Sequence, residues 1–201
     1  MASAKPKISG HSTSQRESLS RADWEQSALE LIAEKGIAGL RVEPLARRLG
    51  ITKGSFYWHF SDRQDLLQGA LKRWETLDSQ HLQAFADFGH ERDALENLEA
   101  FFRRTSRQQL THRVYSALLS APNELAVGET LKRVTDRRMA FLTESYQRLG
   151  YEAHQAHCHA QLTYCAYVGF LQLSPQGMAP EADTKAYEDY TEHLIQVLLR
   201  H

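Results

Sequence analysis

The chain contains few residues that break helices or cross-link a fold. Its 201 residues include 11 glycines, 5 prolines and 2 cysteines, and no segment shows sustained β alternation. An all-α fold is therefore expected. Cys158 and Cys165 lie on one predicted helix, about 10 Å apart along its axis, which is too far for an intrachain disulfide. We expect both thiols to be reduced and partly buried.

Long apolar runs and common catalytic motifs are also missing. No run approaches the roughly 20 residues needed to cross a bilayer, and residues 1–20 lack the apolar core of a signal peptide. The sequence therefore predicts a cytoplasmic protein with no membrane partner. It contains no glycine-rich phosphate loop, no G-x-S-x-G turn and no H-E-x-x-H helix. We accordingly predict no enzyme activity, no catalytic residues and no cofactor.

What is present is a globular composition whose charge is divided unevenly. The chain is 42% hydrophobic and 24% charged, with a net charge of −1. Residues 1–60 carry nine Lys and Arg against six Asp and Glu, whereas the remainder carries 15 against 19. The modest positive excess near the N-terminus suits a partner that carries phosphates, such as nucleic acid.

Residues 46–60 predict two short helices joined by a tight turn. Gly50 follows Leu49, where a helix would end, and glycine readily adopts the left-handed conformation found just past helix ends. Thr52 then stands where a new helix needs an N-cap oxygen. Because the turn is too short for a loop, the two helices must cross steeply, as they do in a helix-turn-helix.

The second helix, predicted over residues 52–60, separates buried from exposed side chains. Phe56 and Phe60 are four residues apart and share one face, which we expect to be buried. The opposite side is unlike a solvated face, which would be rich in Glu, Lys and Gln. It is formed by Gly54, Ser55, Tyr57 and Trp58, with Lys53 and His59 flanking the buried stripe.

Such an outward face suits a DNA major groove. An exposed helix that begins with Thr, Lys, Gly and Ser offers donors to phosphates and base edges. Gly54 costs about 1 kcal/mol relative to alanine, which is understandable where a side chain would collide with a close partner. The alternative, a helical hairpin inside an all-α core, accounts for the two phenylalanines but not for the outward residues.

Leu45 and Ala46, with the run Leu-Gly-Ile-Thr-Lys-Gly-Ser-Phe-Tyr-Trp-His-Phe over residues 49–60, resemble the DNA-binding motif of the TetR family of bacterial transcriptional regulators. The resemblance extends from about Arg21 to about Leu71. It implies an N-terminal three-helix helix-turn-helix DNA-binding domain and a C-terminal helical ligand-binding and dimerisation domain. It also implies a repressor that binds a palindromic operator in double-stranded DNA as a homodimer and is released by a small-molecule effector.

The candidate DNA-binding residues come from this motif and its flanks. Family members commonly have Thr or Ser before the supporting helix, predicted here over residues 42–49, whereas this chain has Arg41. An arginine can bind phosphate but cannot accept a capping hydrogen bond. Arg63, near the start of the following helix, is expected to contact phosphate; the alternative is a solvated side chain. The full set is Arg41, Thr52, Lys53, Gly54, Ser55, Tyr57, Trp58, His59 and Arg63.

Three regions are predicted along the chain. Residues 1–19 form a disordered arm, whose basic side chains either touch DNA or are simply solvated. Residues 20–66 form the helix-turn-helix DNA-binding domain, and residues 67–201 form the effector-binding and dimerisation domain.

Capping signals mark the starts of two helices. Ser20 with Asp23 has the spacing of a capping box and opens a first helix that ends at Gly36. Ser61 with Gln64 has the same spacing and opens the helix that leads out of the helix-turn-helix.

The C-terminal region is predicted to consist of further helices. The apolar pattern places them near residues 94–102, 114–119, 131–149, 152–173 and 181–200. The fourth is almost continuously apolar in its second half. By resemblance, the last two helices form a four-helix interface with a second subunit, although a buried central helix of a monomer would show the same pattern.

Two features of this region leave alternatives open. His154, His157 and Cys158 share a helix face at a spacing that can bind metal, so a metal or redox sensor stands against ordinary polar residues near a helix start. A DNA-binding regulator without a small-molecule effector is the other alternative. Aromatic side chains either line a ligand cavity or simply fill the core: Phe85, Phe88, Phe101, Phe102, Tyr115, Phe141, Tyr146 and Tyr164.

Overall fold

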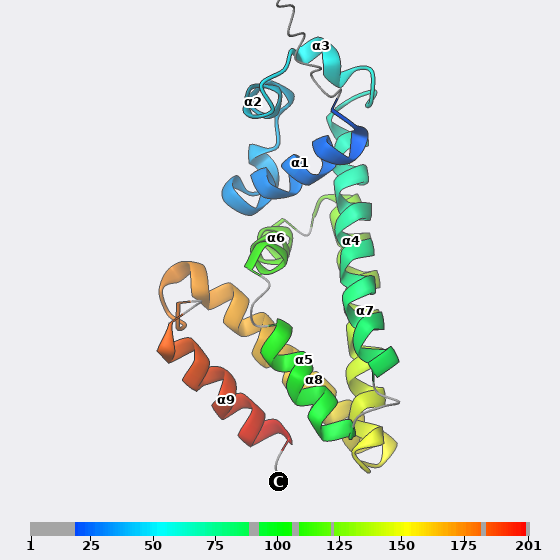
Figure 1. The fold of residues 1–201 in the computed structure, drawn as a ribbon, viewed down its shortest axis with the longest axis vertical. Coiled ribbons are helices and arrows are strands. Elements are labelled where there is room, and N and C mark those ends of the chain that lie inside the picture. The colour runs from blue at the N-terminus through cyan, green and yellow to red at the C-terminus, as the bar shows by residue number, and fades with distance from the viewer. Residues whose placement is uncertain (1–18, 89–92, 106–108, 122, 182–183, 200–201) are drawn as a thin grey trace, which may run out of the picture.

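The computed structural model describes residues 19–88, 93–105, 109–121, 123–181 and 184–199. Within these ranges all regular secondary structure is helical, which confirms the all-α prediction (Figure 1). The predicted arm lies outside the described residues except for its last residue, Leu19. The elements are α1 (Arg21–Lys35), η1 (Ile37–Gly39), α2 (Val42–Arg48), α3 (Lys53–Phe56), α4 (Arg63–Phe88), α5 (Ala94–Thr105), α6 (Gln109–Leu119), α7 (Leu125–Arg148), α8 (Ala153–Leu173), η2 (Ser174–Gln176) and α9 (Lys185–Leu199).

The first capping box is confirmed. The Ser20 hydroxyl accepts a hydrogen bond from the Asp23 N–H at 3.3 Å, and the Asp23 carboxylate accepts one from the Ser20 N–H at 2.7 Å. The helix ends as predicted, because Gly36 has a φ of 68° and its N–H donates to the Ile32 carbonyl at 2.8 Å. This conformation is unfavourable for a residue with a side chain.

The second capping box was predicted one residue too early. Asp62, not Ser61, caps α4, since its carboxylate accepts from the Asp65 N–H at 2.9 Å. The Ser61 N–H donates to Asp65 at 3.0 Å, where Gln64 was the expected partner. Asp and Ser are about equally good N-caps, so the sequence leaves this register open. Arg21 contributes to the choice by binding Asp65 at 2.7 Å.

A long α4 is the axis of the molecule. In Figure 1 it runs from the end that carries α1, α2 and α3 to the end that carries α5, α8 and α9, with α7 beside it. Helix α6 lies between α1 and α8 and packs against both. Because α4 continues without a break past residue 66, the boundary proposed there between two domains stays a prediction.

Two hydrophobic clusters stabilise this arrangement. The larger one joins the helix-turn-helix to the rest of the chain, since Trp24 and Phe56 belong to the same cluster as Trp74, Tyr115 and Leu171. The smaller one lies between α5, α7, α8 and α9. Its buried members are Leu98, Leu142, Tyr146, Ala156, Ala160, Ile195, Leu198 and Leu199. No helix in the described ranges is long and apolar enough to span a bilayer.

Candidate nucleic-acid interface and C-terminal cavity

The helix-turn-helix is present with the predicted turn. Gly50 follows α2 with a φ of 68°, in the left-handed region that favours glycine. The next N–H, that of Ile51, donates to the Ala46 carbonyl at 3.0 Å and closes the turn. Arg41 is the N-cap residue of α2 and makes no side-chain capping bond, as expected for a side chain without an acceptor.

The second helix is shorter than predicted. Helix α3 ends at Phe56, and residues 57–59 form turns in which Tyr57 donates to Gly54 at 3.2 Å and His59 donates to Phe56 at 2.9 Å. These are the tighter three-residue bonds that replace α-helical bonding near helix ends. The Phe60 N–H still reaches the Phe56 carbonyl at 3.0 Å, so the two phenylalanines keep their common side.

Thr52 has the backbone conformation of an N-cap but not its hydrogen bond. Its φ and ψ are −82° and 152°, and its hydroxyl makes no bond to a backbone N–H. Instead the hydroxyl lies 3.2 Å from that of Ser55, so the predicted capping oxygen is wrong. The two hydroxyls satisfy each other on the outward side of α3.

The predicted facing of this segment is confirmed. Phe56 and Phe60 are 0% and 2% exposed, whereas Tyr57 and Trp58 are 59% and 88% exposed. The Phe56 ring lies edge-on to Trp24 with ring centroids 5.4 Å apart. The side chains that point outward are therefore an indole and a phenol, which are large groups to leave mostly exposed.

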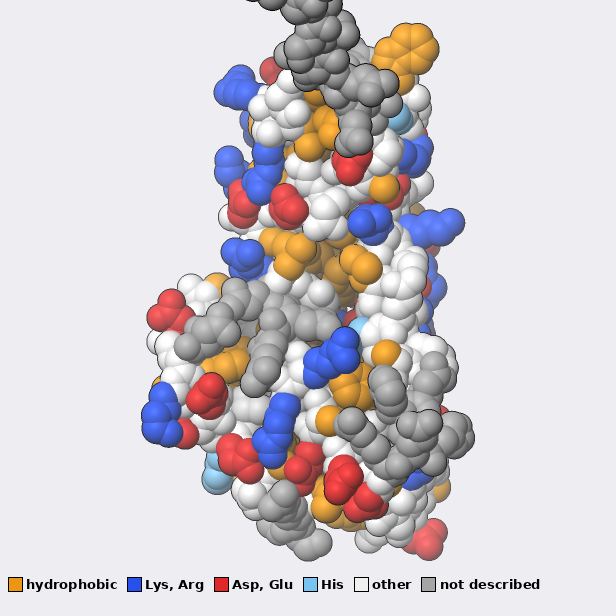
Figure 2. Space-filling model, in the orientation of Figure 1, with side chains coloured by type: hydrophobic (Ala, Val, Ile, Leu, Met, Phe, Trp, Pro, Cys, Tyr) orange, Lys and Arg blue, Asp and Glu red, His pale blue; other side chains and the backbone are white. Residues whose placement is uncertain are grey.

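The basic residues of this end are arranged unevenly. Lys53 pairs with Glu43 at 3.1 Å, while Arg41, the residue before α2, is exposed. Figure 2 shows Lys and Arg side chains along both edges of the end that carries α1, α2 and α3, with Asp and Glu side chains among them, and further Asp and Glu side chains at the opposite end. This distribution agrees with the charge division along the sequence.

Arg63 is not brought together with the other candidate residues. Its Nε and Nη2 donate to the carbonyls of Leu40 and Ile37 at 2.8 and 2.9 Å, and its Nη1 lies 3.3 Å from Glu124. The guanidinium therefore connects α4 to the segment before α2 and to the start of α7. Arg63 is therefore not a fully solvated side chain, and its contact with phosphate stays a prediction.

A cavity of about 100 Å³ lies in the C-terminal part, bounded by α4, α5, α6, α7, α8 and α9. Of the aromatic candidates, Phe101, Phe102 and Tyr164 line it. Phe85, Tyr115, Phe141 and Tyr146 lie in the surrounding core, and the side chain of Phe88 lies outside the described residues. Four further aromatic residues line the cavity but were not predicted: Tyr167, Phe170, Tyr187 and Tyr190.

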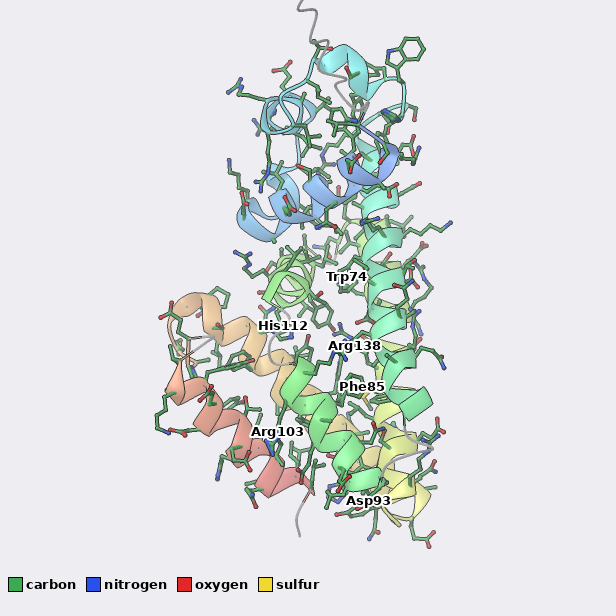
Figure 3. All side chains as sticks on the ribbon, in the orientation of Figure 1. Trp74, Phe85, Asp93, Arg103, His112 and Arg138 are labelled. Atoms are coloured by element: carbon green, nitrogen blue, oxygen red, sulfur yellow. The ribbon has the colours of Figure 1, made fainter. Side chains whose placement is uncertain are left out.

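A buried ion pair also lines the cavity. Arg138 and Asp78 are 8% and 5% exposed, and the Arg138 Nε and Nη2 donate to one carboxylate oxygen at 3.0 and 2.6 Å. The guanidinium lies over the Tyr115 ring at 4.6 Å and the Tyr167 ring at 5.4 Å. Figure 3 shows Arg138 in the interior, between α4 and the helices opposite it.

Sequence reasoning missed this pair, although a signal for it exists. Asp78 follows Leu71 and Trp74 at helical spacing, in a position where the buried stripe of α4 would have an apolar residue. Arg138 follows Val134 in the same way on α7. A charged residue in an apolar stripe is costly unless it is paired, so two such residues on two helices predict each other as partners.

Burial shifts the pKa values of other groups around the cavity in the direction that favours their uncharged forms. Desolvation, followed by repulsion from Arg104, lowers the pKa of His81 below its usual range. Burial raises the pKa of Tyr146 to about 12, even though its hydroxyl contacts that of Thr163 at 2.6 Å. Burial likewise raises the pKa of Tyr164.

The structure bears on two expectations for α8: the possible metal site at His154, His157 and Cys158, and the burial of the two cysteines. His154 Nε2 and Cys158 Sγ are 3.8 Å apart, but the described part of the chain contains no cluster of three or more possible metal ligands. Cys158 and Cys165 are both exposed, so the expectation of partly buried thiols is wrong. The reason is that Cys165 lies on the outer side of α8, beside Leu162, which is 57% exposed.

Comparison with known proteins supports the resemblance. Residues 26–70 match the family model described as bacterial regulatory proteins of the tetR family. Tetracycline repressor protein class C from Escherichia coli is 36% identical over 56 residues, which are 28% of this chain and 26% of that protein. The matched segment thus spans about a quarter of the length of this curated relative.

Similarity to solved structures extends over most of the chain. A transcriptional regulator from Saccharomonospora viridis in complex with choline covers 90% of this chain, and 95% of that protein is matched, with 17% identity and a TM-score of 0.75. FadR from Bacillus subtilis in complex with stearoyl-CoA also covers 90%, with 98% of that protein matched, 14% identity and a TM-score of 0.69. Residues 26–70 thus match the TetR family of bacterial regulatory proteins, and the sequence and structural comparisons support a regulator of this family.

Proposed function

We propose that the protein is a transcriptional regulator that binds double-stranded DNA through the outward side of α3 and the turn after it. The observation that supports this is the contrast in exposure between Phe56 and Phe60, which are buried, and Tyr57 and Trp58, which are not. The Trp58 indole is 88% exposed beside small hydroxyl residues, so it buries little surface in the fold. It can stack on or contact a nucleic acid that covers it.

The proposed interface divides its residues by role. Arg41 and Lys53 bind phosphates, and Lys53 exchanges Glu43 for phosphate when DNA is bound. The paired hydroxyls of Thr52 and Ser55 offer hydrogen bonds at the start of the helix, where the backbone N–H groups also favour anions. Gly54 allows close approach, and Tyr57, Trp58 and His59 contact the groove edge. Arg63 is not included, because three of its N–H groups already bind Leu40, Ile37 and Glu124.

The active form is proposed to be a homodimer joined through α8 and α9. Leu162, Leu173 and Val197 are 57%, 40% and 42% exposed on these two helices, where a second copy would cover them. One helix-turn-helix reads only a few base pairs, whereas two related by a two-fold axis read a palindromic operator. The proposed site of action is the cytoplasm, where a bacterial operator is accessible.

The proposed mechanism is repression that a small-molecule effector relieves. The cavity borders α4 and α6, and both of these helices also pack against α1 next to the helix-turn-helix. A ligand that fits the cavity better in the DNA-free conformation therefore weakens operator binding, by no more than its difference in affinity for the two states. Choline and stearoyl-CoA occupy two proteins of similar fold, which supports ligand binding in this architecture.

Selection of bound sequences from random double-stranded DNA tests the DNA-binding proposal. We expect an enriched palindrome whose half-sites are separated by about one helical turn or a multiple of it. Sedimentation of the protein on that sequence should give an even number of chains per site. Enrichment of no sequence would contradict the proposal. If the protein binds a palindrome and no added compound releases it from that DNA, a regulator without a small-molecule effector is favoured.

A further inference from the structure

The charged groups of the C-terminal cavity are Asp78 and Arg138, and their opposite charges cancel. Asp78 accepts two hydrogen bonds from Arg138 through a single oxygen, Oδ1, so the two charges already neutralise each other. Burial lowers the pKa of His81, which also lines the cavity, and so favours its uncharged form, and Tyr164 is a neutral phenol near pH 7 in any case. An ionic ligand would enter without a free counter-charge, and a buried unpaired charge is strongly unfavourable.

Two polar atoms of this pair lack partners. Asp78 Oδ2 and Arg138 Nη1 are buried and form no hydrogen bond with any residue in the described ranges. Both side chains are less than a tenth exposed, and both line the cavity. Buried polar atoms are nearly always hydrogen-bonded, so these two atoms indicate a missing partner. That partner must donate to the carboxylate oxygen and accept from the guanidinium.

The other residues that line the cavity limit the size of the missing partner and require the rest of that molecule to be apolar. Phe101, Phe102 and Phe170 present aromatic surface to the cavity, and Leu82 and Leu142 add aliphatic surface. The volume is about 100 Å³. An apolar cavity of about 150 Å³ in another protein holds benzene, so one substituted ring is the scale that fits with small side-chain movements.

We infer that the effector is an uncharged, single-ring amphipathic compound that donates a hydrogen bond to Asp78 Oδ2 and accepts one from Arg138 Nη1. The ring packs against the aromatic lining, and the polar substituents complete the hydrogen bonding of the ion pair. This inference rests on the proposed function in naming the ligand an effector, whereas binding in the cavity can be measured without DNA.

Calorimetric titration of the full chain without DNA tests the ligand class. The probes are benzamide and 4-hydroxyacetophenone, which are neutral and carry both a donor and an acceptor, and benzoate, phenyltrimethylammonium and toluene, which are anionic, cationic and apolar. We expect one of the two neutral polar probes to bind about tenfold more tightly than each of the other three, the effect of one good hydrogen-bonded pair. Equal or tighter binding of benzoate, phenyltrimethylammonium or toluene overturns the inference, as does no binding of either neutral polar probe.

A variant of the ion pair gives a sharper test. Asp78→Asn preserves size but leaves the Arg138 charge unpaired and replaces one acceptor by a donor. It should lower the affinity for the preferred neutral probe about tenfold and make benzoate the ligand that binds most tightly. The matched control is Asp136→Asn, the same change at an exposed α7 residue that pairs with Lys132 at 2.6 Å, and it should leave all affinities unchanged. An unaltered ranking in folded Asp78→Asn overturns the inference.

A double variant serves if Asp78→Asn does not fold. Asp78→Leu with Arg138→Met removes both charges and both unpartnered atoms, and circular dichroism confirms that the chain is helical. Toluene should then bind at least as tightly as the neutral polar probes, whereas a preserved preference for those probes overturns the inference. Operator binding is measured separately, by mobility shift, and its outcome does not depend on the outcome of probe binding. Probe binding without DNA binding rejects the proposed function alone, and DNA binding without probe binding rejects the ligand class alone.

Discussion

The two ends of the molecule use aromatic side chains in opposite ways. Around α3, Phe56 and Phe60 fill the core completely, and Tyr57 and Trp58 project from the surface. Around the cavity, the aromatic side chains surround a space that they do not fill, next to a buried ion pair with unpartnered atoms. In the first region the exposed residues therefore indicate function, and in the second the unfilled and unsatisfied interior does.

The largest expected effect is a loss of stability when a ring is removed from the core beneath α3. Comparing it with the loss at the cavity tests whether the first region is packed more tightly than the second. Phe56→Ala should lower the free energy of unfolding by about 3–5 kcal/mol, because it removes a fully buried ring. Phe101→Ala, at the edge of the existing cavity, should cost clearly less, since its surroundings are already open. Urea denaturation of both variants measures the difference. Equal losses would mean that the two regions are packed alike.

The ion pair of the cavity provides the next test. Asp78→Leu leaves the Arg138 guanidinium buried without a counter-charge and should lower the free energy of unfolding by about 3 kcal/mol. Adding Arg138→Met should restore most of that loss, because the pair is then replaced by apolar side chains of similar size. If the double variant is less stable than Asp78→Leu, the pair contributes more to stability than its unpartnered atoms suggest.

A smaller effect is expected on the outward side of α3. Tyr57→Ala should weaken binding to the selected operator by about 1–3 kcal/mol, the loss of one good contact. Its free energy of unfolding and its oligomeric state should stay unchanged, because the side chain is mostly exposed. Fluorescence anisotropy with labelled DNA measures the affinity. Undiminished binding in a folded dimer would place the interface elsewhere.

The smallest effect concerns pH and the cavity. Burial, with a further contribution from Arg104, lowers the pKa of His81 in the folded chain, so the unfolded chain binds a proton at higher pH than the folded one does. The stabilisation is complete above the unfolded pKa of about 6.5 and is lost as the pH falls below it. His81→Gln should remove this part of the pH dependence of unfolding between pH 7 and 5. An identical pH profile for both proteins would exclude His81 as its source.

Sequence reasoning succeeded where the relevant residues are close together along the chain. Gly50, the Ser20 capping box and the facing of Phe56 and Phe60 depend on neighbours within a few residues, and periodicity alone predicts them. The errors at α3 and Ser61 are local too. At α4, Ser61 and Asp62 compete for one backbone donor, and at α3 the Thr52 hydroxyl binds the Ser55 hydroxyl in place of a backbone N–H; the sequence does not show which partner prevails.

The cavity could not be predicted to the same extent, because six helices contribute to it. Phe101 and Tyr190 come from helices far apart in the sequence, and periodicity says that each is buried but not that they face the same space. The apolar second half of α8 was assigned to a subunit interface, and that assignment obscured the cavity position of Tyr167 and Phe170. Arg63 is similar, since its acceptors at Ile37 and Leu40 are backbone atoms that no side-chain pattern reveals.

The continuity of α4 has a mechanical consequence. The helix rises about 27 Å between His81 at the cavity and Arg63 beside the helix-turn-helix. Treated as a rigid lever that pivots at His81, α4 moves its N-terminal end by roughly 2 Å for a tilt of about 5°, a large part of the 3.4 Å spacing of neighbouring nucleotides. Arg63 fastens that end to the segment before α2, so α2 and α3 travel with it. A small tilt of α4 at the cavity would thus move the proposed DNA-binding surface by about half of that spacing or more.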